Sequence, residues 1–213
     1  MRNLKMLALA AVAASALMAF IGAGTASATV LCSTTTGNNP CPTAQKWFNQ
    51  PLLFSLTPET SLLLKETGGS TFQTCKGSEI GAEITNTGSS TETVTGKFTK
   101  STLSSCTFPH TTTALGGFEI HRIAGTSNGT VTVDGVTKTT INTVFFGTCI
   151  YGVENGKSLG DITEGKPAIL HINAVKKKME GSNVACPETL LWTATYTLTS
   201  PKETTLSVSD STD

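Results

Sequence analysis

The chain has 213 residues, and its 15 Lys and Arg balance its 15 Asp and Glu, so the formal net charge is zero. A neutral chain without basic clusters argues against nucleic acid or an anionic membrane as a partner. The length suits a single domain. Thirty-eight threonines follow residue 28, and this β-branched composition favours strands over a helical bundle.

Residues 1–28 have the pattern of a secretory signal peptide. Arg2 and Lys5 precede an apolar run from Met6 to Ile21, and Ala26-Ser27-Ala28 follows with small side chains. We expect cleavage after Ala28. The alternative is a membrane anchor, but 16 residues fall short of the roughly 20 that cross a bilayer as a helix. Cleavage leaves 13 basic and 15 acidic residues, a net charge of −2, and no membrane span.

An even number of cysteines in an exported chain indicates disulfides. Six cysteines allow fifteen connectivities, and the sequence does not select one. We expect the sequential pairing, in which the first loop is short. No two cysteines have the spacing of a zinc or redox motif. The expected pairs are Cys32–Cys41, Cys75–Cys106 and Cys149–Cys186.

The chain divides into three parts after the leader. Residues 29–50 predict an irregular arm that the first disulfide holds. Residues 51–201 predict one β domain, and residues 202–213 predict a polar tail in which Leu206 and Val208 can add an edge strand.

Short strand patterns recur about every ten residues within the β domain, and Gly, Pro and Asn-Gly or Asp-Gly pairs separate them. Gly88, Asn128-Gly129, Asp134-Gly135 and Asn155-Gly156 carry the clearest turn signals. About ten short strands predict an all-β fold, an antiparallel β-sandwich or a barrel. The expected strands are Leu52–Leu56, Ser61–Thr67, Thr71–Cys75, Glu79–Thr87, Thr91–Thr99, Leu115–Ile123, Thr130–Val133, Val136–Phe146, Ala168–Met179 and Leu191–Thr199.

The last two strands have the clearest alternation. In Leu191–Thr199 four threonines alternate with apolar residues, so we expect one buried face and one threonine face. In Ala168–Met179 three apolar residues share a face with Lys176. We therefore expect this strand to leave the core at Lys176–Lys178 and to expose three lysines as a solubilising edge.

The candidate catalytic patterns are weak. Gly125-Thr126-Ser127-Asn128-Gly129 matches the nucleophile elbow of serine hydrolases, which requires a helix after the serine. The following residues predict a strand, so we interpret Ser127 as part of a hairpin loop.

Histidines and carboxylates form no local motif. His110, His121 and His171 are far apart in the sequence, so only the fold could bring them together as a zinc site. Glu79 and Glu83 are the nearest pair of acids on one strand face, and nothing marks them as a glycosidase pair. We expect solvated side chains at all of these positions, and neither a metal nor a cofactor.

Short motifs surround the later cysteines and end the last strand. They are Thr74-Cys75, the Asn-Thr-Gly hairpin within Thr85–Thr95, Cys106, Gly147-Thr148-Cys149 to Gly152, Ala185-Cys186-Pro187, Trp192–Thr197 and Thr199-Ser200-Pro201. Over about Gly69 to Pro201 they resemble a family of secreted, threonine-rich, disulfide-containing actinobacterial β proteins. The chain departs from this pattern by running twelve residues beyond Pro201. The resemblance implies the Cys149–Cys186 disulfide and supplies no functional residue.

Two functions follow from these patterns. We expect a secreted, non-enzymatic β module that binds an extracellular or cell-envelope ligand. The alternative is a secreted hydrolase whose histidines or acids meet only in three dimensions. A concave apolar surface favours the first, and convergence of His110, His121 and His171 or of two carboxylates in one pocket favours the second.

Overall fold

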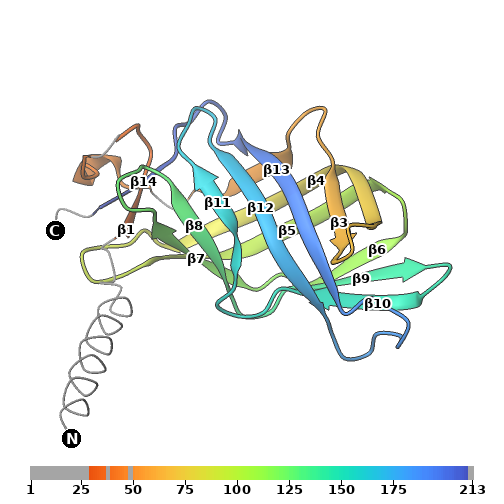
Figure 1. Ribbon diagram of the computed structural model, residues 1–213. Helices are drawn as coiled ribbons and strands as arrows, with labels where there is room; N and C mark the ends of the chain where they lie inside the picture. Colours follow the sequence, from red (N-terminus) through yellow and green to blue (C-terminus); the bar gives the residue numbers. More distant parts are fainter. Residues whose placement is uncertain (1–28, 37–38, 48–49, 211–213) are drawn as a thin grey trace, which may run out of the picture.

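A computed structural model describes residues 29–36, 39–47 and 50–210 (Figure 1). The expected signal peptide and its cleavage site at Ala28 lie outside these residues. Strands dominate, and the single short helix in this part of the chain is a 3-10 turn at Thr43–Gln45, which confirms the all-β prediction. The strands are β1 Thr29–Cys32, β2 Leu52–Leu56, β3 Leu62–Glu66, β4 Thr71–Asn86, β5 Val94–Cys106, β6 His110–Ala114, β7 Gly117–Arg122, β8 Gly129–Asp134, β9 Lys138–Thr143, β10 Gly147–Gly152, β11 Ser158–Thr163, β12 Ile169–Lys178, β13 Thr189–Ser200 and β14 Ser207–Asp210.

Twelve of the strands form one antiparallel sheet that closes into a barrel. Strands β4, β5, β12 and β13 run through its whole length. Each of the four remaining columns contains two short strands that follow one another in the same direction: β2 then β3, β6 then β7, β8 then β9, and β10 then β11. The strand pairings therefore describe an eight-column barrel with two halves.

The two halves differ in how completely they close. In the closed half, which contains β2, β7, β8 and β11, every strand pairs with both neighbours. In the split half, which contains β3, β6, β9 and β10, no strand pairing joins β5 to β6 in the described chain. We call this gap the β5–β6 seam.

Glycines at positive φ bend the split columns. Gly116, Gly135 and Gly156 each lie between the two consecutive strands of one column. Their φ angles are 66°, 88° and 71°, and residues other than glycine rarely adopt such positive values. The predictions that Asp134-Gly135 and Asn155-Gly156 are hairpin turns were therefore wrong, because β8 and β9 continue in one direction, as do β10 and β11. The hairpin predicted at Asn128-Gly129 is present between β7 and β8.

The strands carry apolar side chains inward and threonines outward. In β13, Leu190, Tyr196 and Leu198 are buried while the threonines between them lie on the outer face, as predicted. Outer hydroxyls pair across neighbouring strands, for example Thr57 with Thr197 at 2.9 Å between the Oγ1 atoms. Such cross-strand pairs stabilise a sheet without charge.

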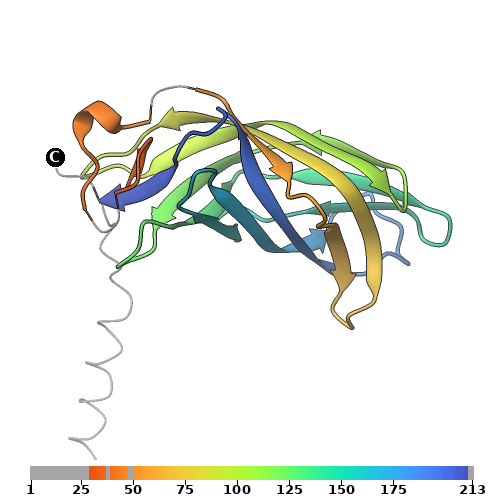
Figure 2. The ribbon, with the colours of Figure 1, turned by 90° about the horizontal axis from the view of Figure 1, so that it is seen from above.

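The two chain ends cover the closed half of the barrel. Strand β1 pairs with β14 along its whole length, so residues 29–32 are a strand rather than part of an irregular arm. Leu31, Leu206 and Val208 join the main core. In both views this small sheet lies at the end opposite the β9–β10 hairpin (Figure 1, Figure 2).

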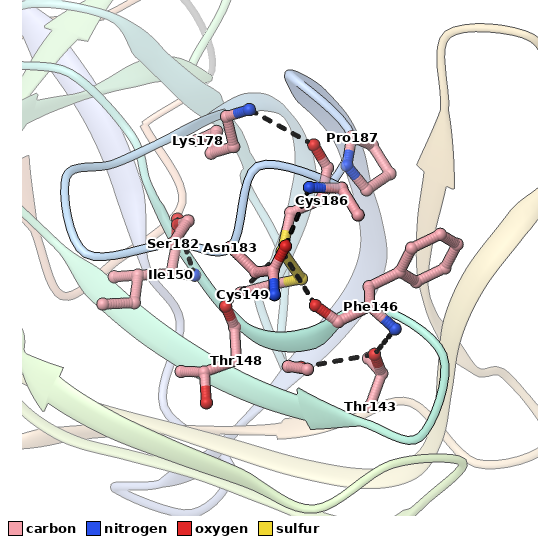
Figure 3. The surroundings of a disulfide bond; sticks show 12 residues. Thr143, Phe146, Thr148, Cys149, Ile150, Lys178, Ser182, Asn183, Cys186 and Pro187 are labelled. Carbon is pink, nitrogen blue, oxygen red and sulfur yellow. Dashed lines mark hydrogen bonds between the residues drawn. A yellow bond between two sulfur atoms is a disulfide. The ribbon is translucent and has the colours of Figure 1, made fainter.

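Three disulfides join the residues of the sequential pairing, Cys32–Cys41, Cys75–Cys106 and Cys149–Cys186. The third ties β10 to the loop between β12 and β13 (Figure 3). The backbone N–H of Asn183 donates to the backbone carbonyl of Thr148 at 2.9 Å, so this loop continues along β10 beyond the end of β12.

Gly160 provides a test of the strand register in β11. Its φ is 149°, and a Cβ atom there would lie 1.9 Å from the His171 carbonyl oxygen of β12. We expect Gly160→Ala to lower the free energy of unfolding by about 2–5 kcal/mol, measured by urea denaturation. Gly68→Ala is the matched control, because a Cβ atom there meets nothing within 4 Å. Equal stability of the two variants would contradict the pairing of β11 with β12.

Candidate functional site

The three histidines lie on three different strands. His121 of β7 is exposed beside Glu119, with 3.2 Å between its Nε2 and the carboxylate, and His171 of β12 is exposed beside Thr195. His110 belongs to β6. Neither cavity described below is lined by a histidine, and the described residues contain no cluster of three or more His, Cys, Asp or Glu that could hold a metal ion.

The other candidates also have structural positions. Ser127 lies in the turn between β7 and β8, so the helix that a nucleophile elbow needs does not follow it. Glu79 and Glu83 both project from β4 toward lysines of β5, Lys100 and Lys97 respectively. The convergence required by a hydrolase is not found among these residues.

The lysine run departs most from the sequence prediction. Lys177 lies outside and forms an ion pair with Glu154, whereas Lys178, on the same strand face as Lys176, is only partly exposed and forms an ion pair with Glu188. Lys176, however, is only 5% exposed. The prediction that Lys176–Lys178 leaves the core was wrong for Lys176, because β12 keeps its strict alternation and turns this side chain into the barrel.

A cavity occupies the split half of the barrel beside Lys176. It contains about 590 Å³ of empty space when its open mouth is counted. A second space of about 350 Å³ with an entirely apolar wall lies in the closed half. The main cavity is predominantly apolar, and its wall includes Leu62, Leu64, Ile80, Phe98, Leu103 and Leu159.

The cavity wall includes both edges of the β5–β6 seam. Ser101 and Leu103 come from β5, whereas Thr112 comes from β6 and Leu115 from the bend that follows it. Only a few contacts join these two strands, and β6 makes its ladder with β9. The seam is therefore the place where the wall of the cavity lacks a continuous ladder of backbone hydrogen bonds.

Lys176 has few partners inside the cavity. Its Nζ lies 3.4 Å from Thr139 Oγ1 and 4.5 Å from the centre of the Trp192 ring. No carboxylate forms an ion pair with it in the described chain. Removal from water disfavours the ammonium form, and burial lowers the pKa of Lys176 to about 8.

Trp192 adds a donor that has no partner among the described residues. Its indole N–H is buried and has no hydrogen-bond acceptor among the described residues. Indole nitrogen can only donate, and a buried donor without a partner costs free energy. The wall of the cavity thus includes one residue with an amine and one with an indole donor, and the amine has the Thr139 hydroxyl as its hydrogen-bond partner.

The sequence contained one signal that could have identified this site. Lys176 follows Leu170, Ile172 and Ala174 at even spacing, the spacing of one strand face. The inward position required knowledge that β12 pairs with β13 without a bulge through Lys177. Trp192 was expected in the core, but its contact with Lys176 depends on that same register.

No protein-family model, curated protein or solved structure matches the chain. Within the described residues, no helix has the length and apolar character needed to cross a membrane. The fold and the cavity define the molecule as an antiparallel eight-column barrel with a buried cationic group. The function therefore has to be inferred from the side chains that line the cavity.

Lys176→Met tests the burial of the amine. Between about pH 8 and the ordinary lysine pKa of 10.5, the unfolded chain binds more protons than the folded one, so wild-type stability rises with pH. The cost of the buried ammonium is fully present at pH 7. We expect Lys176→Met to raise the free energy of unfolding at pH 7 by about 1–3 kcal/mol, and this gain to shrink as pH rises above 8.

Lys177→Met is the matched control, because Lys177 lies next to Lys176 but projects into solvent. We expect it to change stability by less than about 0.5 kcal/mol at either pH. Chemical denaturation at pH 7 and pH 10 measures both variants. A loss of stability in Lys176→Met at pH 7 would contradict the burial of an unpaired charge.

Proposed function

We propose that this protein is a non-enzymatic binding module whose barrel cavity holds a small, mainly apolar molecule ending in a carboxylate or carbonyl oxygen. The observation that carries the proposal is the imbalance of hydrogen-bonding groups in the cavity. Lys176 donates to one hydroxyl, that of Thr139, at 3.4 Å, and the Trp192 indole N–H has no acceptor among the described residues. A ligand oxygen would satisfy groups that the protein leaves without good partners.

The wall of the cavity suits an apolar ligand body. Leucines of β3, β5 and β11 face it together with Ile80 and Phe98. Each methylene group that leaves water for such a surface contributes about 0.8 kcal/mol. A carboxylate head also supplies the anion that Lys176 lacks, and a charge pair inside a low-dielectric wall is stronger than one at the surface.

The β5–β6 seam supports entry from solvent. Its rim has polar side chains, including Ser101 and Thr112, and the exposed Lys100 lies beside it. A ligand that enters here meets hydroxyl groups first and the apolar wall afterwards. Separation of two strands without a shared ladder breaks fewer hydrogen bonds than opening any other column.

We also propose that the protein works outside the cytoplasm, where it meets its ligand in the medium or the cell envelope. Three disulfides in a chain of this size support this location, because reducing compartments keep thiols free. The lack of a convergent set of histidines or carboxylates in the described residues gives no support to the hydrolase alternative.

Titration with octanoate and with octylamine tests the proposed ligand chemistry. The two molecules share an apolar chain and differ in the charge of the head group. We expect octanoate to change the fluorescence of Trp192 and to raise the midpoint of thermal unfolding, because binding to the folded state stabilises it. We expect octylamine to do neither, since its ammonium would lie beside Lys176.

Two variants separate binding in the cavity from binding elsewhere. In Trp192→Phe the fluorescence change should disappear, and Trp47, which is buried outside the cavity wall, should report nothing. In Lys176→Met the affinity for octanoate should fall about ten-fold or more. Equal binding of octanoate and octylamine, or no binding of either, would overturn the proposal.

A further inference from the structure

We propose that Lys176 captures small apolar aldehydes in the cavity as a reversible imine. This inference rests on the proposed function, because the aldehyde must first enter the cavity through the β5–β6 seam. The inference restricts the proposed ligand from any molecule with an oxygen acceptor to a carbonyl compound that reacts with the Lys176 amine. The site is the amine nitrogen of Lys176, between Thr139 and the face of Trp192.

The surroundings of Lys176 differ from those of the exposed lysines. Lys97, Lys100 and Lys177 are each held by a glutamate, and a carboxylate stabilises the ammonium, which has no lone pair for attack. Lys176 faces the apolar cavity wall, a hydroxyl and an aromatic ring. Burial without an anion favours the neutral amine, and the lowered pKa of Lys176, about 8, agrees with this geometry.

The reaction needs only the amine and the aldehyde. The nitrogen lone pair attacks the carbonyl carbon and a carbon–nitrogen bond forms. The carbonyl oxygen takes up the two protons that leave the amine nitrogen and departs as water, so a neutral C=N bond replaces C=O and N–H₂. No oxidant or reductant is consumed, and the step reverses on addition of water.

The buried position favours the product as well as the attack. Below the pKa of Lys176 the ammonium first releases one proton to solvent, and the neutral amine then forms a neutral imine, so the overall conversion removes a charge that the barrel interior does not balance. The water that is released can leave through the seam. An exposed lysine gains nothing comparable, because solvent and a carboxylate already stabilise its charge.

The experiment traps the imine by reduction. The wild-type protein is incubated with hexanal and sodium cyanoborohydride at pH 7.5, and peptide mapping by mass spectrometry follows alkylation at each lysine. We expect Lys176 to be alkylated about ten-fold or more faster than Lys177. Octanoate should slow labelling at Lys176 alone, and denaturation in urea should abolish the preference.

Variants and the octanoate titration make the outcome decisive. In Lys176→Met the fast site should be lost, whereas in Lys177→Met the rate at Lys176 should not change. Labelling of Lys176 no faster than that of Lys177 in the folded protein would overturn the inference. If octanoate binds while this labelling preference is absent, the imine alone is refuted. If octanoate also fails to bind, the proposed function fails with it.

Discussion

The unbroken pairing of β12 with β13 is the constraint on which the rest of the barrel depends. From Ile169 opposite Thr197 to Lys177 opposite Thr189, each residue has a partner and no bulge intervenes. Alternation then has to continue along β12. The register that buries Leu170 and Ile172 therefore buries Lys176, and a one-residue slip would expose the whole apolar face of the strand.

The same pairing helps to close the barrel. Strand β13 also pairs with both β2 and β3 on its other side. The Tyr196 hydroxyl of β13 forms a hydrogen bond of 2.8 Å with the Ser78 hydroxyl of β4. A closed sheet must fill its interior with side chains. The side chains of the described residues leave a space inside beside Lys176.

The resulting cavity combines two costs that a ligand can relieve. Among the described residues, no carboxylate forms an ion pair with the buried Lys176 amine and no acceptor meets the buried Trp192 indole N–H. Both groups line one apolar space whose wall is interrupted at the β5–β6 seam. Local rules are commonly broken at functional sites, and the proposed function gives both groups the same chemical complement, a ligand oxygen.

Several features of the fold could be predicted from residue patterns because they depend on local geometry. Alternation identified the inner and outer faces of β13, and turn residues such as Asn128-Gly129 marked a real hairpin. The turn signal at Gly135 misled, because a positive φ serves a bend within a column as well as a chain reversal. The partners of β1 and β14 could not be predicted, since they lie at opposite ends of the chain.

The sequence alone determined the all-β class, the threonine-covered outer faces and the even spacing that places Lys176 with Ile172. These properties follow from side chains and near neighbours, whose physics is local. Only the tertiary structure decided that β12 stays paired through Lys177, that β6 separates from β5, and that Trp192 meets the amine. Those outcomes depend on which distant strands close the barrel, and no single segment carries that information.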